Sequence, residues 1–97
     1  MNYFNKQPSE IFPFSVDFVD RMDIAETILS KTVIAIELVH NADVSSTVID
    51  GSTINGTIID VRVKAGIDGV SYKITVRVVT SGGNTLEEDI TMYVVEE

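Results

Sequence analysis

The sequence predicts an all-β domain, and three observations support this prediction. Apolar and polar residues alternate over long stretches of the second half, which is the period of strands with one buried and one solvent-exposed face. Turn-forming dipeptides separate these stretches. The chain has 97 residues, of which 44% are hydrophobic, and this is enough for one hydrophobic core but not for two.

Residues 1–11 are predicted to form an N-terminal arm, and residues 12–97 a β-sandwich domain. The stretch from Tyr3 to Phe14 is rich in aromatic and aliphatic side chains, yet it also contains both prolines of the chain. Two interpretations stay open for this stretch. It packs against its own domain, or it reaches a neighbouring protein and adds a strand there.

The next elements are predicted from periodicity and residue type. Apolar residues alternate at 12–18 and predict a strand, which Pro13 restricts to a sheet edge or to its first residues. Residues 23–28 have the spacing of a helix cap, whereas β-branched residues dominate the following stretch. We therefore predict a turn, or at most one helical turn, at 23–28, a strand at 31–39, and a short strand at 45–49.

Three alternating stretches in the second half predict three consecutive strands. They lie at 59–64, 70–80 and 86–96, and the last two are expected to pair as an antiparallel hairpin across Ser81-Gly82-Gly83-Asn84. Further turns are expected at Asp50-Gly51, Asn55-Gly56 and Asp68-Gly69, because these residues tolerate a positive φ.

Tyr72 follows the Asp68-Gly69 turn at the start of a long strand and predicts a tyrosine corner, in which the phenol hydroxyl bonds to nearby main chain. With about seven short strands separated by turns, the fold class is predicted to be an immunoglobulin-like two-sheet antiparallel sandwich.

Charge and composition exclude several classes of function. The formal net charge of −8 disfavours nucleic acid and anionic membranes as partners, because both attract clustered Lys and Arg. The absence of cysteine excludes disulfides, thiol nucleophiles and Cys-type metal sites. Neither a secretory signal nor an apolar run of about 20 residues is visible.

The aspartates and the histidine of the chain do not form a recognisable metal-binding or catalytic motif. Asp17, Asp20 and Asp23 are closely spaced, but they lack the pattern of a calcium loop and are ordinary turn residues. His40 is the only histidine, no G-x-S-x-G motif is present, and a solvated or hydrogen-bonded imidazole is expected. We therefore expect no catalytic residues, no metal and no cofactor.

Two apolar features instead predict a surface for a protein partner. The last predicted strand has apolar residues on both faces, and the arm carries several anchors. The residues predicted to contact a partner are Phe4, Ile11 and Phe12 on the arm, and Tyr93 and Val95 on the last strand.

The order of several short motifs resembles a family of small phage proteins from tail and head–tail gene cassettes, some of them fibre–tail adaptors. The motifs are Lys6-x-Pro8-x-Glu10, Asp17-Phe18, Glu26-Thr27-Ile28, Gly51-Ser52-Thr53-Ile54-x-Gly56, Gly66-x-x-Gly69-x-x-Tyr72 and Tyr93-Val94-Val95-Glu96.

This resemblance implies a non-enzymatic virion component, made in the bacterial cytoplasm, that joins a multi-copy assembly. Its partners would be other virion or assembly proteins, and homo-oligomerisation stays open. The alternative function is a carbohydrate-binding or adhesion sandwich. The composition disfavours this alternative, because sugars usually stack on exposed aromatic rings and the chain has no Trp and only three Tyr.

Overall fold

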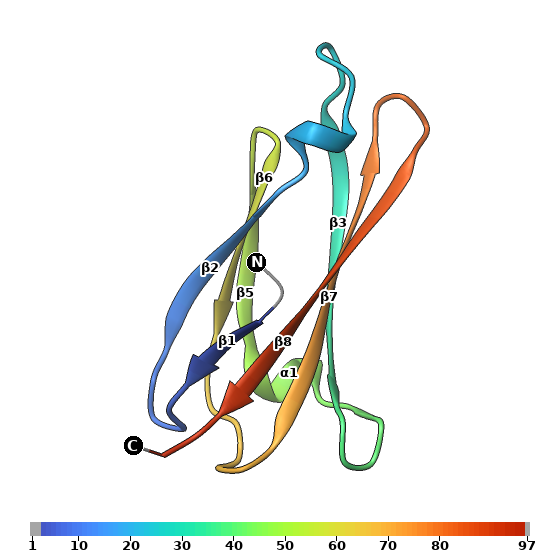
Figure 1. The fold of residues 1–97 in the computed structure, drawn as a ribbon. Helices are drawn as coiled ribbons and strands as arrows, with labels where there is room; N and C mark the ends of the chain where they lie inside the picture. Colours follow the sequence, from blue (N-terminus) through green and yellow to red (C-terminus); the bar gives the residue numbers. More distant parts are fainter. Residues whose placement is uncertain (1–2, 97) are drawn as a thin grey trace.

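The computed structural model describes residues 3–96 and folds into two β-sheets packed face to face (Figure 1). The strands are β1 (Tyr3–Lys6), β2 (Phe12–Asp17), β3 (Ile28–Glu37), β4 (Ala42–Asp43), β5 (Ile49–Asn55), β6 (Ile58–Val63), β7 (Ser71–Thr80) and β8 (Thr85–Val94). A 3₁₀-helix, η1 (Val19–Arg21), follows β2, and a single α-helical turn, α1 (Ser45–Val48), precedes β5.

The described strands form one sheet in the order β1-β8-β7-β3-β4 and another in the order β2-β6-β5. The prediction of an all-β, two-sheet sandwich is thus confirmed. The β7–β8 hairpin is antiparallel, as predicted, with Ile74 opposite Ile90. Among the described strands β2 pairs with β6 alone and so lies at a sheet edge, the position to which Pro13 restricts it.

Strand β1 pairs with β8 of the same chain, with Tyr3 opposite Thr91 and Lys6 opposite Val94. This pair is parallel, whereas the other strand pairs in the described residues are antiparallel. Part of the predicted arm therefore extends the larger sheet of its own domain. The division of the chain at residue 11 stays a prediction.

The predicted strand at 45–49 is wrong, because residues 45–48 form the helical turn α1 and the strand begins at Ile49. The side chain of Asp43 explains the turn: its Oδ1 accepts hydrogen bonds from the Ser45 N–H at 3.0 Å and the Ser45 hydroxyl at 2.6 Å. Such local side-chain bonds compete with strand formation despite the β-branched residues of this stretch.

Two other boundaries differ from the prediction. Strand β3 begins at Ile28 and ends at Glu37, three residues before and two residues short of the predicted bounds, whereas the turn predicted at 23–28 is confirmed, with turn residues at 24–25. Asp50-Gly51 is not a turn but lies inside β5, where the pairing with β6 shifts between Ile49 and Gly51. The shift is a β-bulge, and a glycine with a φ of 151° fits there without strain. The turns at 68–69 and 81–84 are confirmed, whereas the turn expected at Asn55-Gly56 lies one residue later, at 56–57, because Asn55 is the last residue of β5.

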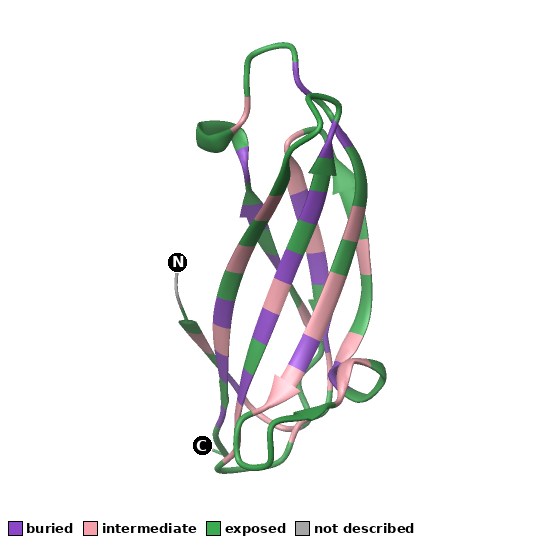
Figure 2. Ribbon diagram, turned by 90° about the vertical axis from the view of Figure 1, so that its right-hand side faces the viewer, coloured by how far each residue is buried: buried purple, intermediate pink, exposed green. Residues whose placement is uncertain are grey.

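The core lies between the sheets and is mostly aliphatic. Buried and exposed residues alternate along the central strands, as Figure 2 shows. The buried side chains are Phe14, Val16, Phe18, Ile28, Ala35, Val48, Ile59, Val61, Val63, Tyr72, Ile74, Val76, Val78, Ile90, Met92 and Val94. The predicted tyrosine corner is confirmed, because the Tyr72 Oη accepts a hydrogen bond from the Ile67 N–H at 2.9 Å.

Among the residues that the structure describes, no helix is both long and apolar enough to cross a membrane.

Candidate interaction surfaces

The sandwich is elongated, with principal extents of 43 × 23 × 20 Å. One end, here called the apex, is formed by residues 18–27 and the turns at 56–57 and 81–84. The opposite end, the base, is formed by the loops at 7–11, 38–41 and 64–70, and the end of β8 leads to it (Figure 1).

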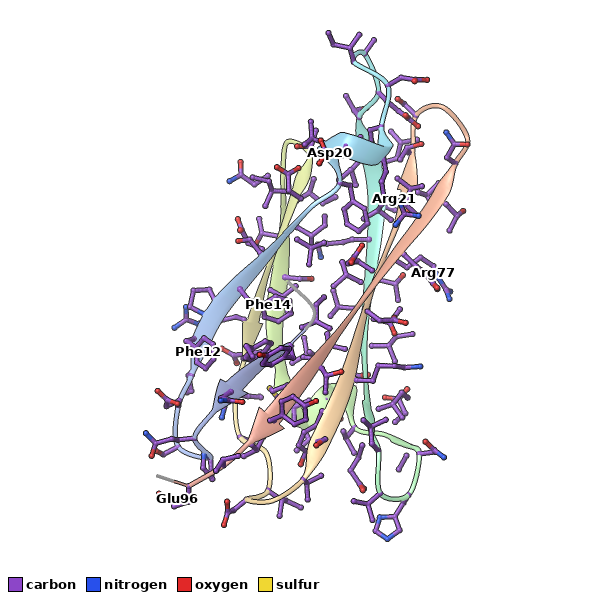
Figure 3. The ribbon with its side chains drawn as sticks, viewed as in Figure 1. Phe12, Phe14, Asp20, Arg21, Arg77 and Glu96 are labelled. Carbon is purple, nitrogen blue, oxygen red and sulfur yellow. The ribbon has the colours of Figure 1, made fainter. Side chains whose placement is uncertain are left out.

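Two of the predicted contact residues, Phe4 and Phe12, are half-buried and contact each other. Their ring centroids lie 5.5 Å apart with an edge-on geometry, and Phe4 lies 5.1 Å from the buried Phe14. Phe12 and Phe14 extend from the same strand in Figure 3. This aromatic cluster joins β1 of the larger sheet to β2 of the smaller sheet, so Phe4 and Phe12 hold the N-terminal segment on its own domain.

The other three predicted contact residues are exposed. Tyr93 lies on the outer face of β8, and its ring packs edge-on against Tyr3 with centroids 5.8 Å apart. Ile11 and Val95 lie at the base. The structure therefore places the five residues in two groups, one internal cluster and one exposed set, which do not form a single patch.

Lys6 carries a contact that the sequence did not predict. Its side chain is only 1% exposed, and the ammonium donates hydrogen bonds to the carbonyl oxygens of Gln7 at 2.8 Å, Pro8 at 3.2 Å and Ala65 at 2.5 Å. Burial lowers the pKa of Lys6, and the nearby Glu10 carboxylate opposes this effect. The Lys6-x-Pro8-x-Glu10 motif was the available signal, because it forms the turn that folds over the ammonium: the Gln7 N–H donates to Glu10 Oε1 at 2.7 Å.

The apex is held together by a second polar cluster around Glu26. Its Oε1 accepts a hydrogen bond from the Asp23 N–H at 2.9 Å, and its Oε2 accepts bonds from the Thr80 hydroxyl and, at 3.1 Å, from the Asn84 side-chain amide. These bonds, led by that from Thr80, lower the pKa of Glu26. They fix the apical loop at 22–27 to the β7–β8 turn, with a further bond from the Ser81 N–H to the Thr27 carbonyl at 2.8 Å.

Above this cluster the apex exposes apolar side chains among acidic ones. Ile24 is fully exposed, and Val19 and Leu29 are at least half exposed. Asp20 and Arg21 extend from η1 at the same end of the sandwich (Figure 3). Arg21 is tied to β8, because its Nη1 donates to the Glu87 carbonyl at 2.7 Å and lies 3.7 Å from Glu88.

The base exposes a larger apolar set and also contains a pocket. The exposed residues are Ile11, Leu38, Val39, Ile67 and Val95. The base pocket, lined mainly by Glu37, Val44, Val48, Ala65, Ile67 and Tyr72, has a volume of about 240 Å³.

His40 lies beside this pocket on the β3–β4 loop. Its Nδ1 is 3.1 Å from both carboxylate oxygens of Glu37, and its side chain is 76% exposed. This bond lowers the pKa of Glu37. The imidazole is hydrogen-bonded and solvated, as expected. Its bond to Glu37 links the β3–β4 loop to the end of β3.

The family model of the podophage GP4 fiber-tail adaptor protein gp77 matches residues 6–93. The chain belongs to this family. A search of curated proteins gave no match. Membership in this adaptor family makes the protein a structural component of a phage tail, as the resemblance implied, and the matched residues include Lys6, Glu26 and Tyr93.

Proposed function

We propose that the protein joins two structural proteins of the phage tail, one at the apex and one at the base, and that it catalyses no reaction. The observation that carries this proposal is the separation of two exposed apolar sets at opposite ends of a 43 Å sandwich. An adaptor needs two surfaces that different partners can occupy together, and the adaptor family supports such a role.

The apex suits insertion into a partner. Ile24 projects from a loop that the Glu26 cluster holds in place. A held loop loses little conformational entropy on binding, so more of the free energy of burying Ile24 contributes to affinity. Asp20 and Asp23 beside it favour a partner surface with basic residues around an apolar recess.

The base offers a broader contact. Of the residues predicted from the sequence, Ile11 and Val95 contribute to it directly. Tyr93 and Tyr3 extend the contact surface along the outer face of β8, where exposed tyrosines are frequent anchors of interfaces. Phe4 and Phe12 act indirectly by keeping the N-terminal segment in position. The net charge of −8 selects basic partners and limits self-association.

Complementation of a phage that lacks the gene tests the proposal. Wild type, Ile24→Asp at the apex and Ile11→Asp at the base are supplied in trans, and the tail, fibre and adaptor proteins of purified particles are quantified by mass spectrometry. Thr32→Asp, at an exposed position on the side of the sandwich, is the matched control for the added charge.

We expect complementary defects. One end variant is missing from the particles, because it no longer binds the tail, and the other is present in particles that lack fibres. Thr32→Asp gives complete particles. Complete particles without the protein, or the same defect in both end variants, would contradict a two-ended adaptor.

A further inference from the structure

The base pocket is apolar and large enough for one side chain. Val44, Val48 and Tyr72 form much of its wall, and Ile67, which is 65% exposed, stands at its rim. A cavity of about 150 Å³ in a protein core can hold a benzene molecule. A pocket of about 240 Å³ therefore accommodates a leucine, methionine or phenylalanine side chain of a partner.

The pocket wall is held in position before any partner binds. The Ala65 carbonyl accepts the hydrogen bond from the buried Lys6 ammonium, and the Ile67 N–H is bonded to Tyr72. Ala65 has a φ of 53°, a left-handed conformation that a residue with a Cβ keeps only when its surroundings hold it. The loop at 64–70 thus presents a preformed wall, and preformed sites bind with a smaller entropic cost.

Three carboxylates belong to the segments that form this apolar pocket. Glu37 lines it, and Asp43 and Asp68 are adjacent in the chain to the lining residues Val44 and Ile67. Hydrogen bonds lower the pKa of Glu37, through His40, and of Asp43, through Ser45, so that both carboxylates are ionised at neutral pH.

Basic groups near the pocket are already paired. The Lys64 ammonium lies 3.7 Å from Asp50 Oδ1, and the Lys6 ammonium points inward to carbonyl oxygens. The rim therefore attracts positive charge. A second copy of this chain, with a net charge of −8, is disfavoured as the occupant.

We propose that the base pocket binds one large apolar side chain from a segment of a partner protein in which Lys or Arg residues flank that side chain. The proposal rests on the adaptor function and specifies the chemistry of the partner at one of its two ends. The pocket supplies specificity for the apolar residue, and the carboxylates of Glu37, Asp43 and Asp68 attract the basic segment.

A peptide titration followed by NMR tests the proposal on the full chain. The probes are three capped peptides, Lys-Lys-Leu-Lys-Lys, Lys-Lys-Ala-Lys-Lys and Glu-Glu-Leu-Glu-Glu. We expect saturable shifts at pocket residues with the first peptide, a roughly tenfold weaker affinity with the alanine peptide because a leucine side chain is no longer buried, and no saturation with the acidic peptide.

Three variants test where the peptide binds and whether charge contributes. Thr47→Phe adds a ring at an exposed lining position and should abolish the saturable shifts, whereas Thr32→Phe, on the outer face of β3, should leave them unchanged. Glu37→Gln removes one carboxylate and should weaken binding of the leucine peptide by about two- to fivefold at low salt. Thermal unfolding verifies that each variant is folded.

Several results would overturn the proposal. Equal affinity for the leucine and alanine peptides, or shifts located away from the pocket, would show that charge alone attracts the probe. Concentration-dependent self-association that Thr47→Phe removes would assign the pocket to a second copy.

The complementation experiment separates this proposal from the adaptor function. If Thr47→Phe is incorporated normally and supports fibre attachment while Ile11→Asp does not, the base is used and the pocket is not. If both proteins fail to give complete particles and the peptide still binds wild type at the pocket, both proposals are supported.

Discussion

Replacing Lys6 by methionine tests whether one buried ammonium holds the N-terminal segment against the loop at 64–70. Each hydrogen bond to a charged group contributes about 1.5–3 kcal/mol, but burying an ammonium costs several kcal/mol, so the three bonds largely offset that cost. Methionine keeps most of the side-chain volume and leaves the Ala65 carbonyl without its donor. We therefore expect Lys6→Met to lower the free energy of unfolding by about 1–3 kcal/mol.

Urea denaturation followed by circular dichroism measures this loss, and Lys73→Met, at an exposed position of β7, is the control, expected within about 0.5 kcal/mol of wild type. The midpoint of thermal unfolding, Tm, should fall by about 4–8 °C for each kcal/mol of lost stability in a chain of this size. Hydrogen exchange gives a local readout, since the Val95 N–H donates to the Lys6 carbonyl at 2.8 Å and should exchange faster in the variant.

The pH dependence supplies a second test of the same contact. Because burial lowers the pKa of Lys6, the folded chain binds fewer protons than the unfolded chain in the alkaline window below the ordinary lysine pKa of about 10.4. Wild-type stability should therefore gain from rising pH in that window, relative to Lys6→Met. A variant as stable as wild type, with the same alkaline profile, would refute the reasoning.

Three further predictions concern the loops. Gly66→Ala should lower the free energy of unfolding, measured by urea denaturation, by about 2–4 kcal/mol, because φ is 99° and the new Cβ would lie 2.7 Å from a methyl group of Val94 in β8. Its control is Gly69→Ala, where φ is 84° but the space is open, and the expected loss is only about 1–2 kcal/mol. Glu26→Gln should reduce the loss of stability in acid, measured as Tm from pH 3 to 7. Because the pKa of Glu26 is lowered in the folded chain, its carboxylate stabilises the fold at pH values above its unfolded-state pKa of about 4.3. This stabilisation is lost as the pH falls through the folded-state pKa. Tyr72→Phe should cost about 1 kcal/mol and speed amide exchange in the preceding loop, whereas unchanged exchange there would contradict the bond to Ile67.

Periodicity and turn chemistry predicted those parts of the fold that depend on neighbouring residues. The β7–β8 hairpin follows from two alternating stretches around a glycine-rich turn, and Tyr72 follows from its place after Asp68-Gly69. The wrong prediction of a strand at 45–49 also comes from reasoning on neighbouring residues. Residue type favours a strand there, but one aspartate side chain bonds to the backbone two residues later and stabilises a helical turn.

The candidate surfaces were predictable only in part. Exposed Tyr93 and Val95 follow from apolar residues on the face opposite the core, and Ile11 was predicted as an anchor of the arm. Phe4 and Phe12 turned inward because β1 and β2 bring their rings together. Nothing in the local pattern marks Lys6 as buried. Its most distant hydrogen-bond acceptor, Ala65, lies 59 residues away in the chain.

The sequence by itself determined the class of the fold, the face that each strand buries, the positions of most turns and the acidic charge, because these depend on alternation and composition over a few residues. Only the tertiary structure decided that β1 runs parallel to β8, that the apolar loop residues gather at two opposite ends, and that α1, β3 and the loop at 64–70 enclose a pocket. The physical reason is that a period of two specifies which side of a strand is apolar but not which distant segment will cover it. That choice is made by packing and hydrogen bonds between segments far apart in the chain.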